Sequence, residues 1–150
     1  MKRALKDLGV KQLEKRLDIY FSKFIRLRDS DENGITKCCT CEKYKFWKGK
    51  YLGDTEGADC GHYSKRNRAH RFTEKNCNAQ CKGCNSDKKG KGEADLHALY
   101  IDSKYGTGTA IGLRESENII IKHPREWYIM KMEHYKEKGK KLAKEKGQEY

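Results

Sequence analysis

The chain has 150 residues, a mean hydropathy of −1.07 and a formal charge of +12, from 34 Lys and Arg against 22 Asp and Glu. No apolar run approaches the roughly 18 residues that span a bilayer, and the basic N-terminus lacks the apolar segment of a secretory signal. These features exclude a membrane protein and predict one domain over residues 1–150 with a polyanionic partner, nucleic acid before an anionic membrane surface.

The first predicted element is an amphipathic helix over residues 10–28. Apolar and aromatic side chains fall on one helical face of this segment, at Leu13, Leu17, Tyr20 and Phe24. The polar stretch DSDENG at 29–34 contains a glycine, so the helix is expected to end there. This apolar face is expected either to close the core of the domain or to supply an interface with a second copy.

The middle of the chain, residues 35–92, is predicted to form a core of short strands, loops and cysteine turns. Aromatic and β-prone residues alternate with Lys and Gly over 35–63, which is typical of short strands. We expect a basic loop over 64–76, a cysteine knuckle leading into a helix start over 77–90, and a connector at the Gly-Lys run 88–92.

The C-terminal part, residues 93–150, is predicted to be helical, which makes the fold class α+β. Its first helix is expected to pack through a face formed by Leu96, Leu99 and Tyr100. Pro124 suits the first position of the last helix because its backbone angle is already helical. The residues of that helix expected to pack are Trp127, Tyr135 and either Met130 or Ile129.

The strongest motif is a pair of CxxC sequences, Cys38 with Cys41 and Cys81 with Cys84. Zn²⁺ takes four tetrahedral ligands, and a CxxC turn lets two thiolates reach one ion. Without a secretory signal the thiols are expected to stay reduced, which favours metal binding over disulfides. The four cysteines are therefore predicted to bind one structural zinc ion, which would contribute on the order of 10 kcal/mol to folding.

Other cysteine, aromatic and histidine residues are given structural interpretations. Cys60 and Cys77 are interpreted as small buried side chains rather than as a second metal site, and Cys39 would share an ion with Cys41 only in a tight geometry. Trp47 is expected in the core. Four histidines are expected at the surface, namely His70, His97, His123 and His134.

Asp59, His62, Asn76 and Asn85 have side chains that together suit phosphodiester hydrolysis. A neutral imidazole can deprotonate water near neutral pH, so His62 is the candidate general base. Asn76 can orient that imidazole or fix a loop. Oxygens of Asn85 and Asp59 can hold one hard divalent cation that stabilises charge on the phosphate, although Asn85 could instead cap a helix.

Basic residues flank these positions on both sides in sequence, which predicts a surface for the phosphate backbone of DNA. The side chains predicted to contact DNA are Lys65, Arg66, Arg68, Arg71, Lys75, Lys82, Lys88 and Lys89. No segment resembles a base-reading helix, so recognition of shape and backbone is expected rather than recognition of sequence.

Four stretches follow one another along the chain, CCTC (38–41), ADCGHY (58–63), RFTEKN (71–76) and QCKGCN (80–85). Their order resembles the NinG/Rap family of phage recombination nucleases and, more broadly, the HNH or ββα-metal nucleases held together by zinc. The resemblance implies a treble-clef-like zinc knuckle with a ββα-metal core between flanking helices. It also implies a structure-selective endonuclease that uses Mg²⁺ or Mn²⁺ on branched DNA such as D-loops and Holliday junctions.

Taken residue by residue, the resemblance implies that His62 is the general base, that Asn76 orients the loop or the base, and that Asn85 binds the catalytic metal. In many such nucleases a carboxylate directly precedes the histidine, but this chain has Gly61 there. Asp59 is therefore expected to reach the metal only if the strand bulges, for example at Gly61. Otherwise Asp59 would contact the residues that bind the metal and would not bind the metal itself.

Two other functions stay open from the sequence. A non-catalytic zinc-knuckle DNA-binding module would need the four cysteines and the basic loop, but neither His62 nor Asn85. A protein–protein adaptor would need an acidic partner to suit the charge of +12. For the nuclease, symmetric cutting of a junction suggests a homodimer, and a phage-encoded enzyme of this kind would act in the cytoplasm of the bacterial host.

Overall fold

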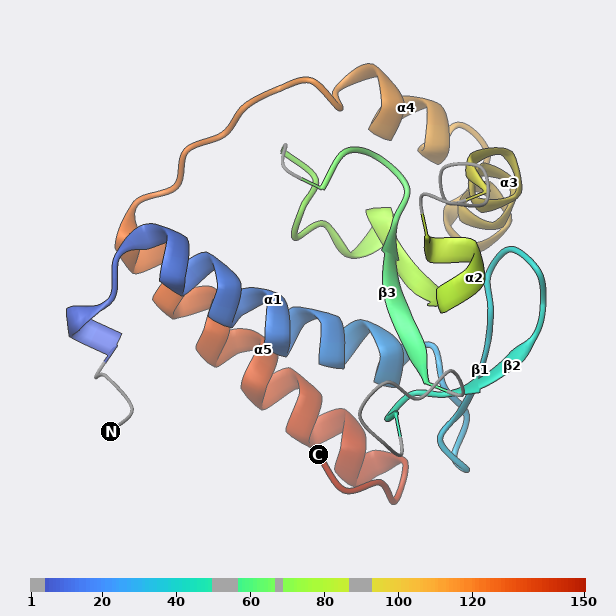
Figure 1. The fold of residues 1–150 in the computed structure, drawn as a ribbon, viewed down its shortest axis with the longest axis horizontal. Coiled ribbons are helices and arrows are strands. Elements are labelled where there is room, and N and C mark those ends of the chain that lie inside the picture. The colour runs from blue at the N-terminus through green and yellow to red at the C-terminus, as the bar shows by residue number, and fades with distance from the viewer. Residues whose placement is uncertain (1–4, 50–56, 67–68, 87–92) are drawn as a thin grey trace.

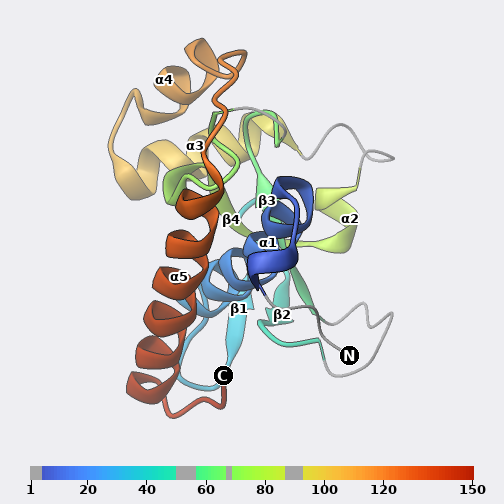
Figure 2. The ribbon, with the colours of Figure 1, turned by 90° about the vertical axis from the view of Figure 1, so that its left-hand side faces the viewer.

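Two long helices, α1 (Val10–Arg28) and α5 (Arg125–Glu145), lie side by side and run in the same direction (Figure 1). The computed structural model describes residues 5–49, 57–66, 69–86 and 93–150. The other elements are η1 (Leu5–Asp7), β1 (Ile35–Lys37), β2 (Tyr44–Phe46), β3 (Ala58–His62), η2 (Glu74–Asn76), β4 (Cys77–Cys81), α2 (Lys82–Asn85), α3 (Ala94–Tyr105) and α4 (Thr109–Glu115). Figure 2 shows α5 beside α1, and α1 also contacts β3 and β4, so the fold is α+β with α1 at its centre.

The main apolar core lies along the contact between α1 and α5. The predicted bounds of α1 are confirmed, and its buried face is formed by Leu13, Leu17, Phe21, Phe24 and Ile25. Helix α5 contributes Tyr128, Met132 and Tyr135. Of the two residues offered as alternatives, Ile129 packs against this core, whereas Met130 is 59% exposed and lies off the face that these three residues share. None of the helices in the described ranges has the length and apolarity needed to cross a membrane.

Two antiparallel pairs of short strands form, β1 with β2 and β3 with β4; β3 and β4 pack against α1, and β1 packs against β4. The strands predicted within 35–63 are confirmed, but β4 lies where a knuckle was expected. Its sequence CNAQC has no β-branched residue, and all five residues are buried, so it has no alternating pattern to mark it as a strand. The helix α2 follows β4 directly.

Charged side chains tie the end of α1 to β4 and α3. The Arg28 guanidinium pairs with both carboxylate oxygens of Asp29, at 2.7 and 2.9 Å, and donates to the carbonyl oxygen of Cys77 at 2.9 Å. Asp29 also accepts hydrogen bonds from the Ala79 N–H at 2.9 Å and from Lys104 Nζ at 2.8 Å. Burial would raise the pKa of Asp29, but the two cations hold it below its usual value.

The first C-terminal helix, α3, packs through a different face from the predicted one. His97 and Ile101 are buried, whereas Leu96 and Leu99 are 46% and 68% exposed. The Asn78 side chain donates a hydrogen bond to Nε2 of His97 at 3.1 Å, and this contact holds that face of α3 against β4. The predicted surface position of His97 was therefore wrong, because apolar periodicity does not reveal a polar contact.

Candidate functional site

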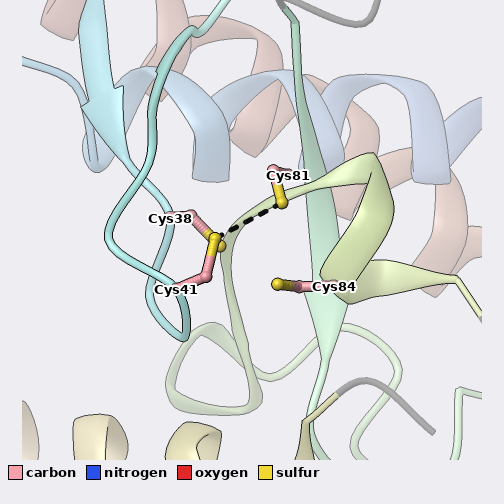
Figure 3. Close-up of side chains that lie close together, drawn as sticks. All are labelled: Cys38, Cys41, Cys81 and Cys84. Atoms are coloured by element: carbon pink, nitrogen blue, oxygen red, sulfur yellow. Dashed lines mark hydrogen bonds between the residues drawn. The ribbon is translucent and has the colours of Figure 1, made fainter. Parts of the chain in front are cut away.

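Four cysteine sulfur atoms converge between the β1–β2 turn and α2 (Figure 3). Cys38 and Cys41 lie in the turn between β1 and β2, Cys81 ends β4, and Cys84 lies in α2. All four sulfur atoms lie within 4.8 Å of one another, and those of Cys41 and Cys81 are 3.6 Å apart. The prediction that the two CxxC sequences form one cluster is confirmed.

The donors of this cluster suit a metal ion that binds thiolates. Burial raises the pKa of the Cys38 thiol, but the N–H of Cys41 and the hydroxyl of Thr40, 3.3 Å from the sulfur, lower it to about 6. Burial raises the pKa of Cys84 to about 12, so this thiol needs a nearby cation to ionise near neutral pH. Four thiolates are the donor set of structural zinc, and the cluster can hold a structural metal such as zinc.

A groove of about 610 Å³ opens beside the end of β3. Its walls come from β3 and the loop after it, from α2, and from the start of α3 and the end of α4. The lining residues are Cys60, His62, Tyr63, Ser64, Lys65, Arg66, Asn85, Ala94, Arg114 and Glu117. The groove therefore brings together His62, Asn85, Lys65 and Arg66 from the predicted site.

His62 closes β3 and is held by the loop that follows it. Its Nε2 lies 3.0 Å from the carbonyl oxygen of Arg71. Because a carbonyl only accepts, Nε2 carries the proton in this bond and the lone pair of the neutral ring is on Nδ1. Burial, with a smaller effect from Arg66, lowers the pKa of His62 to about 4, so the imidazole is neutral near pH 7 and can accept a proton.

Asp59 and Asn85 are in contact, but β3 has no bulge. The strand pairs residue by residue with β4, from Ala58 opposite Cys81 to His62 opposite Cys77. Asp59 is bound by Lys82 Nζ at 3.1 Å and accepts a hydrogen bond from Asn85 Nδ2 at 3.3 Å. The condition set for Asp59 as a direct metal ligand is therefore not met.

The contact with Asp59 orients the Asn85 side chain. The amide nitrogen of Asn85 points to Asp59, so the amide oxygen, the atom that would bind a cation, is on the other side of the group. Asn85 is the last residue of α2, whose N-cap is Cys81, and the N-cap of α3 is Glu93. Asn85 therefore caps the N-terminus of neither α2 nor α3, and the capping alternative is not observed.

Asn76 fixes the loop between β3 and β4. Its side chain is fully buried, accepts a hydrogen bond from the Ser64 N–H at 2.7 Å and donates to the His70 carbonyl oxygen at 3.0 Å. Of the two roles expected for Asn76, these bonds fit the fixing of a loop. That loop carries Lys65 and Arg66 into the groove.

The other predicted DNA contacts have different surroundings. Arg71 is 17% exposed and pairs with Glu14 at 3.0 Å and with Asp18, so it anchors the loop to α1 and does not line the groove, and its contact with DNA stays a prediction. Lys82 pairs with Asp59, and the ammonium of Lys75 lies 6.0 Å from the Tyr105 ring. Arg68, Lys88 and Lys89 lie outside the described residues.

Arg114 is the groove residue that the sequence interpretation missed. It comes from α4, outside the predicted core of 35–92, and its Nη2 lies 3.3 Å from the hydroxyl of Tyr63. Its guanidinium carbon is 5.0 Å from the centre of the Tyr63 ring. No motif surrounds Arg114 in the sequence, so only the packing of α4 against Tyr63, the residue after β3, identifies it.

Comparisons with known proteins gave one match. The family model described as "NinG: Bacteriophage Lambda NinG protein" matches residues 1–145. The matched range includes the four clustered cysteines and every residue that lines the groove. Searches of curated proteins and of solved structures found no match to the chain.

Proposed function

Since the chain belongs to the NinG family, which indicates a role related to phage recombination, we propose that it is a metal-dependent endonuclease for branched DNA. Its substrates would be recombination intermediates such as D-loops and Holliday junctions. The observation that carries this proposal is the groove in which His62 and Asn85 lie beside Lys65, Arg66 and Arg114. Phosphodiester hydrolysis needs a base, an oxygen donor for a cation and positive charge for the phosphates, and it needs them close together.

The order of elements around the groove supports a ββα-metal arrangement. His62 ends the first strand of an antiparallel pair, Asn76 lies in the loop between the strands, and Asn85 ends the helix that follows. The resemblance to HNH nucleases assigns the base, the loop residue and the metal ligand to these three positions. This correspondence supports the ββα assignment within the proposal.

In the proposed reaction, His62 removes a proton from the attacking water. Its neutral imidazole has a fixed tautomer, because Nε2 donates to the Arg71 carbonyl oxygen at 3.0 Å. The amide oxygen of Asn85 would hold Mg²⁺ or Mn²⁺, and Asp59 would orient Asn85 from behind. The ion, completed by water and phosphate oxygens, would stabilise charge on the phosphate and the leaving oxygen.

The substrate would be bound by its backbone. Lys65, Arg66 and Arg114 surround the groove with positive charge, against Glu117 as the acidic lining residue. Contacts of this kind recognise phosphates and duplex shape rather than base sequence. Symmetric cutting of a four-way junction requires two grooves, so a homodimer is part of the proposal.

A cleavage assay tests the proposal. End-labelled four-way junction, D-loop and linear duplex are incubated with the protein and Mg²⁺, and nicks are mapped on denaturing gels. We expect nicks near the branch points, and a loss of about 10²–10⁴-fold in rate for His62→Ala, as for a missing general base. The matched control is His134→Ala, because His134 is exposed on α5 and away from the groove.

The outcomes separate the proposed enzyme from the binding alternative. If the wild type binds the junction but does not cut it, the chain is a DNA-binding module. If His62→Ala cuts as fast as the wild type, the assignment of the base is wrong.

A further inference from the structure

A second group of metal-binding side chains lies on the β3–β4 pair. The sulfurs of Cys60 and Cys77 and a ring nitrogen of His62 all lie within 4.8 Å of one another. The strand register explains the grouping, because Cys60 and His62 are two residues apart on one face of β3 and Cys77 pairs with His62 on β4. None of the three belongs to the four-cysteine cluster.

We propose that Cys60, His62 and Cys77 bind a second zinc ion. Two thiolates and one imidazole are a soft donor set that selects zinc over the magnesium or manganese that prefer oxygen ligands. Three protein ligands leave the fourth position of a tetrahedral ion open. Cys60 and His62 line the groove, so that position would be reached from it.

The surroundings of the three residues fit a bound ion. Cys77 is fully buried between the strands and α1, which makes one side of the site dry and fixed. The Arg71 carbonyl oxygen lies 3.0 Å from Nε2 of His62, and metal-bound histidines commonly donate their second N–H to such a carbonyl. Binding would replace the thiol protons, as metal ions do at coordinating cysteines.

Zinc at this site would also affect the proposed reaction, a consequence that rests on the proposed function. The imidazole that binds zinc no longer has a lone pair for the proton of water. Zinc beyond one equivalent would therefore inhibit cleavage in Mg²⁺.

The experiment is a metal titration of the folded protein. Native mass spectrometry counts bound Zn²⁺, and Co²⁺ substitution reports thiolate ligands through its visible spectrum. We expect the wild type to bind two ions and Cys60→Ser to bind one. Cys39→Ser, which removes a cysteine that neither group contains, should still bind two. Since Cys77 is in the core, Cys77→Ala is the second variant, and it should also bind one.

Two results would overturn the inference, a wild type that saturates at one ion and a Cys60→Ser variant that still binds two. Cleavage is then compared with and without one extra equivalent of Zn²⁺. The extra Zn²⁺ should slow cleavage by the wild type at least about tenfold. It should leave the rate of Cys60→Ser nearly the same as without the extra Zn²⁺. If neither the wild type nor the variant cuts DNA, the proposed nuclease function fails. The number of bound Zn²⁺ ions still tests whether the second zinc site exists.

Discussion

Gly61 stands between Cys60 and His62 on β3, where a side chain from β4 occupies the space that a Cβ atom would need. A Cβ atom at Gly61 would come within 2.0 Å of Oε1 of Gln80, which is itself buried. Gln80 Nε2 lies 3.3 Å from the hydroxyl of Thr40, next to the four-cysteine cluster. The glycine therefore lets a buried side chain reach from β4 towards the β1–β2 turn, which carries Cys38 and Cys41.

Gly61→Ala is expected to destabilise the fold. Gln80 would have to leave its position and its contact with Thr40, which costs roughly 1–3 kcal/mol of unfolding free energy, as overpacking does. Chemical denaturation measures the change. The control is Gly112→Ala in α4, where a Cβ meets nothing within 4 Å and helix propensity predicts a small gain. Equal stabilities for the two variants would contradict the argument.

His97 is expected to make the free energy of unfolding depend on pH. Burial lowers its pKa to about 4 in the folded chain, against 6.5 when it is free. The unfolded chain therefore binds more protons between pH 6.5 and pH 4, and the folded state loses up to about 3 kcal/mol as the pH falls through this window.

The variant His97→Gln isolates this effect because glutamine can still accept the hydrogen bond from Asn78 and does not titrate. The other titratable groups are the same in both proteins. The difference in unfolding free energy between wild type and variant should therefore shrink as the pH falls from 6.5 to 4. A difference that is constant with pH would show that His97 is not the group responsible.

At the scale of elements, a feature could be predicted from the sequence when it is determined by residues close together in the chain. Helix α1 has a regular apolar face and a glycine stop, and its bounds were predicted to the residue. The strand β4 has no such pattern, because all five of its residues are buried among α1, β1, β3 and α2. The four-cysteine cluster followed from spacing alone, whereas the groove wall formed by Arg114 depends on how distant elements pack.

The four-cysteine cluster joins the β1–β2 turn to β4 and α2, so loss of one sulfur should release both. Cys84→Ser is expected to lose zinc and to melt far below the wild type, since structural zinc contributes on the order of 10 kcal/mol. Zinc content and thermal melting are the measurements. Cys39→Ser, outside the cluster, should keep its zinc. An unchanged zinc content in Cys84→Ser would refute the ligand assignment.

The ion group at the end of α1 is a second link between elements. Asp29→Asn would leave the largely buried Arg28 without its carboxylate and is expected to cost about 3–5 kcal/mol, as for a broken buried pair. Urea denaturation gives the value. The control is Glu137→Gln, which breaks an exposed pair with Lys140 and should change the free energy by less than about 1 kcal/mol. A small effect at Asp29 would mean that water replaces its contacts.

At the scale of the whole molecule, the positive charge is divided between internal pairs and the groove. Within the fold, Arg71 forms ion pairs with Glu14 and Asp18 of α1, and Arg28 forms an ion pair with Asp29. Lys65 and Arg114 reach the groove from elements far apart in the sequence, the loop after β3 and α4. The net charge of +12 thus does not by itself locate the proposed DNA-binding surface, and the proposal places that surface at the groove where α4 packs against Tyr63.

Arg114→Ala is the test of this surface. Removing one phosphate contact should weaken binding to a four-way junction several-fold at low salt, and should reduce the slope of log affinity against log salt by about 1. Lys140→Ala removes the same charge from an exposed position on α5, so it controls for net charge alone. Fluorescence anisotropy across a salt series gives both slopes. If the two variants lose affinity equally, binding follows net charge rather than the groove, and the proposed path of the DNA is wrong.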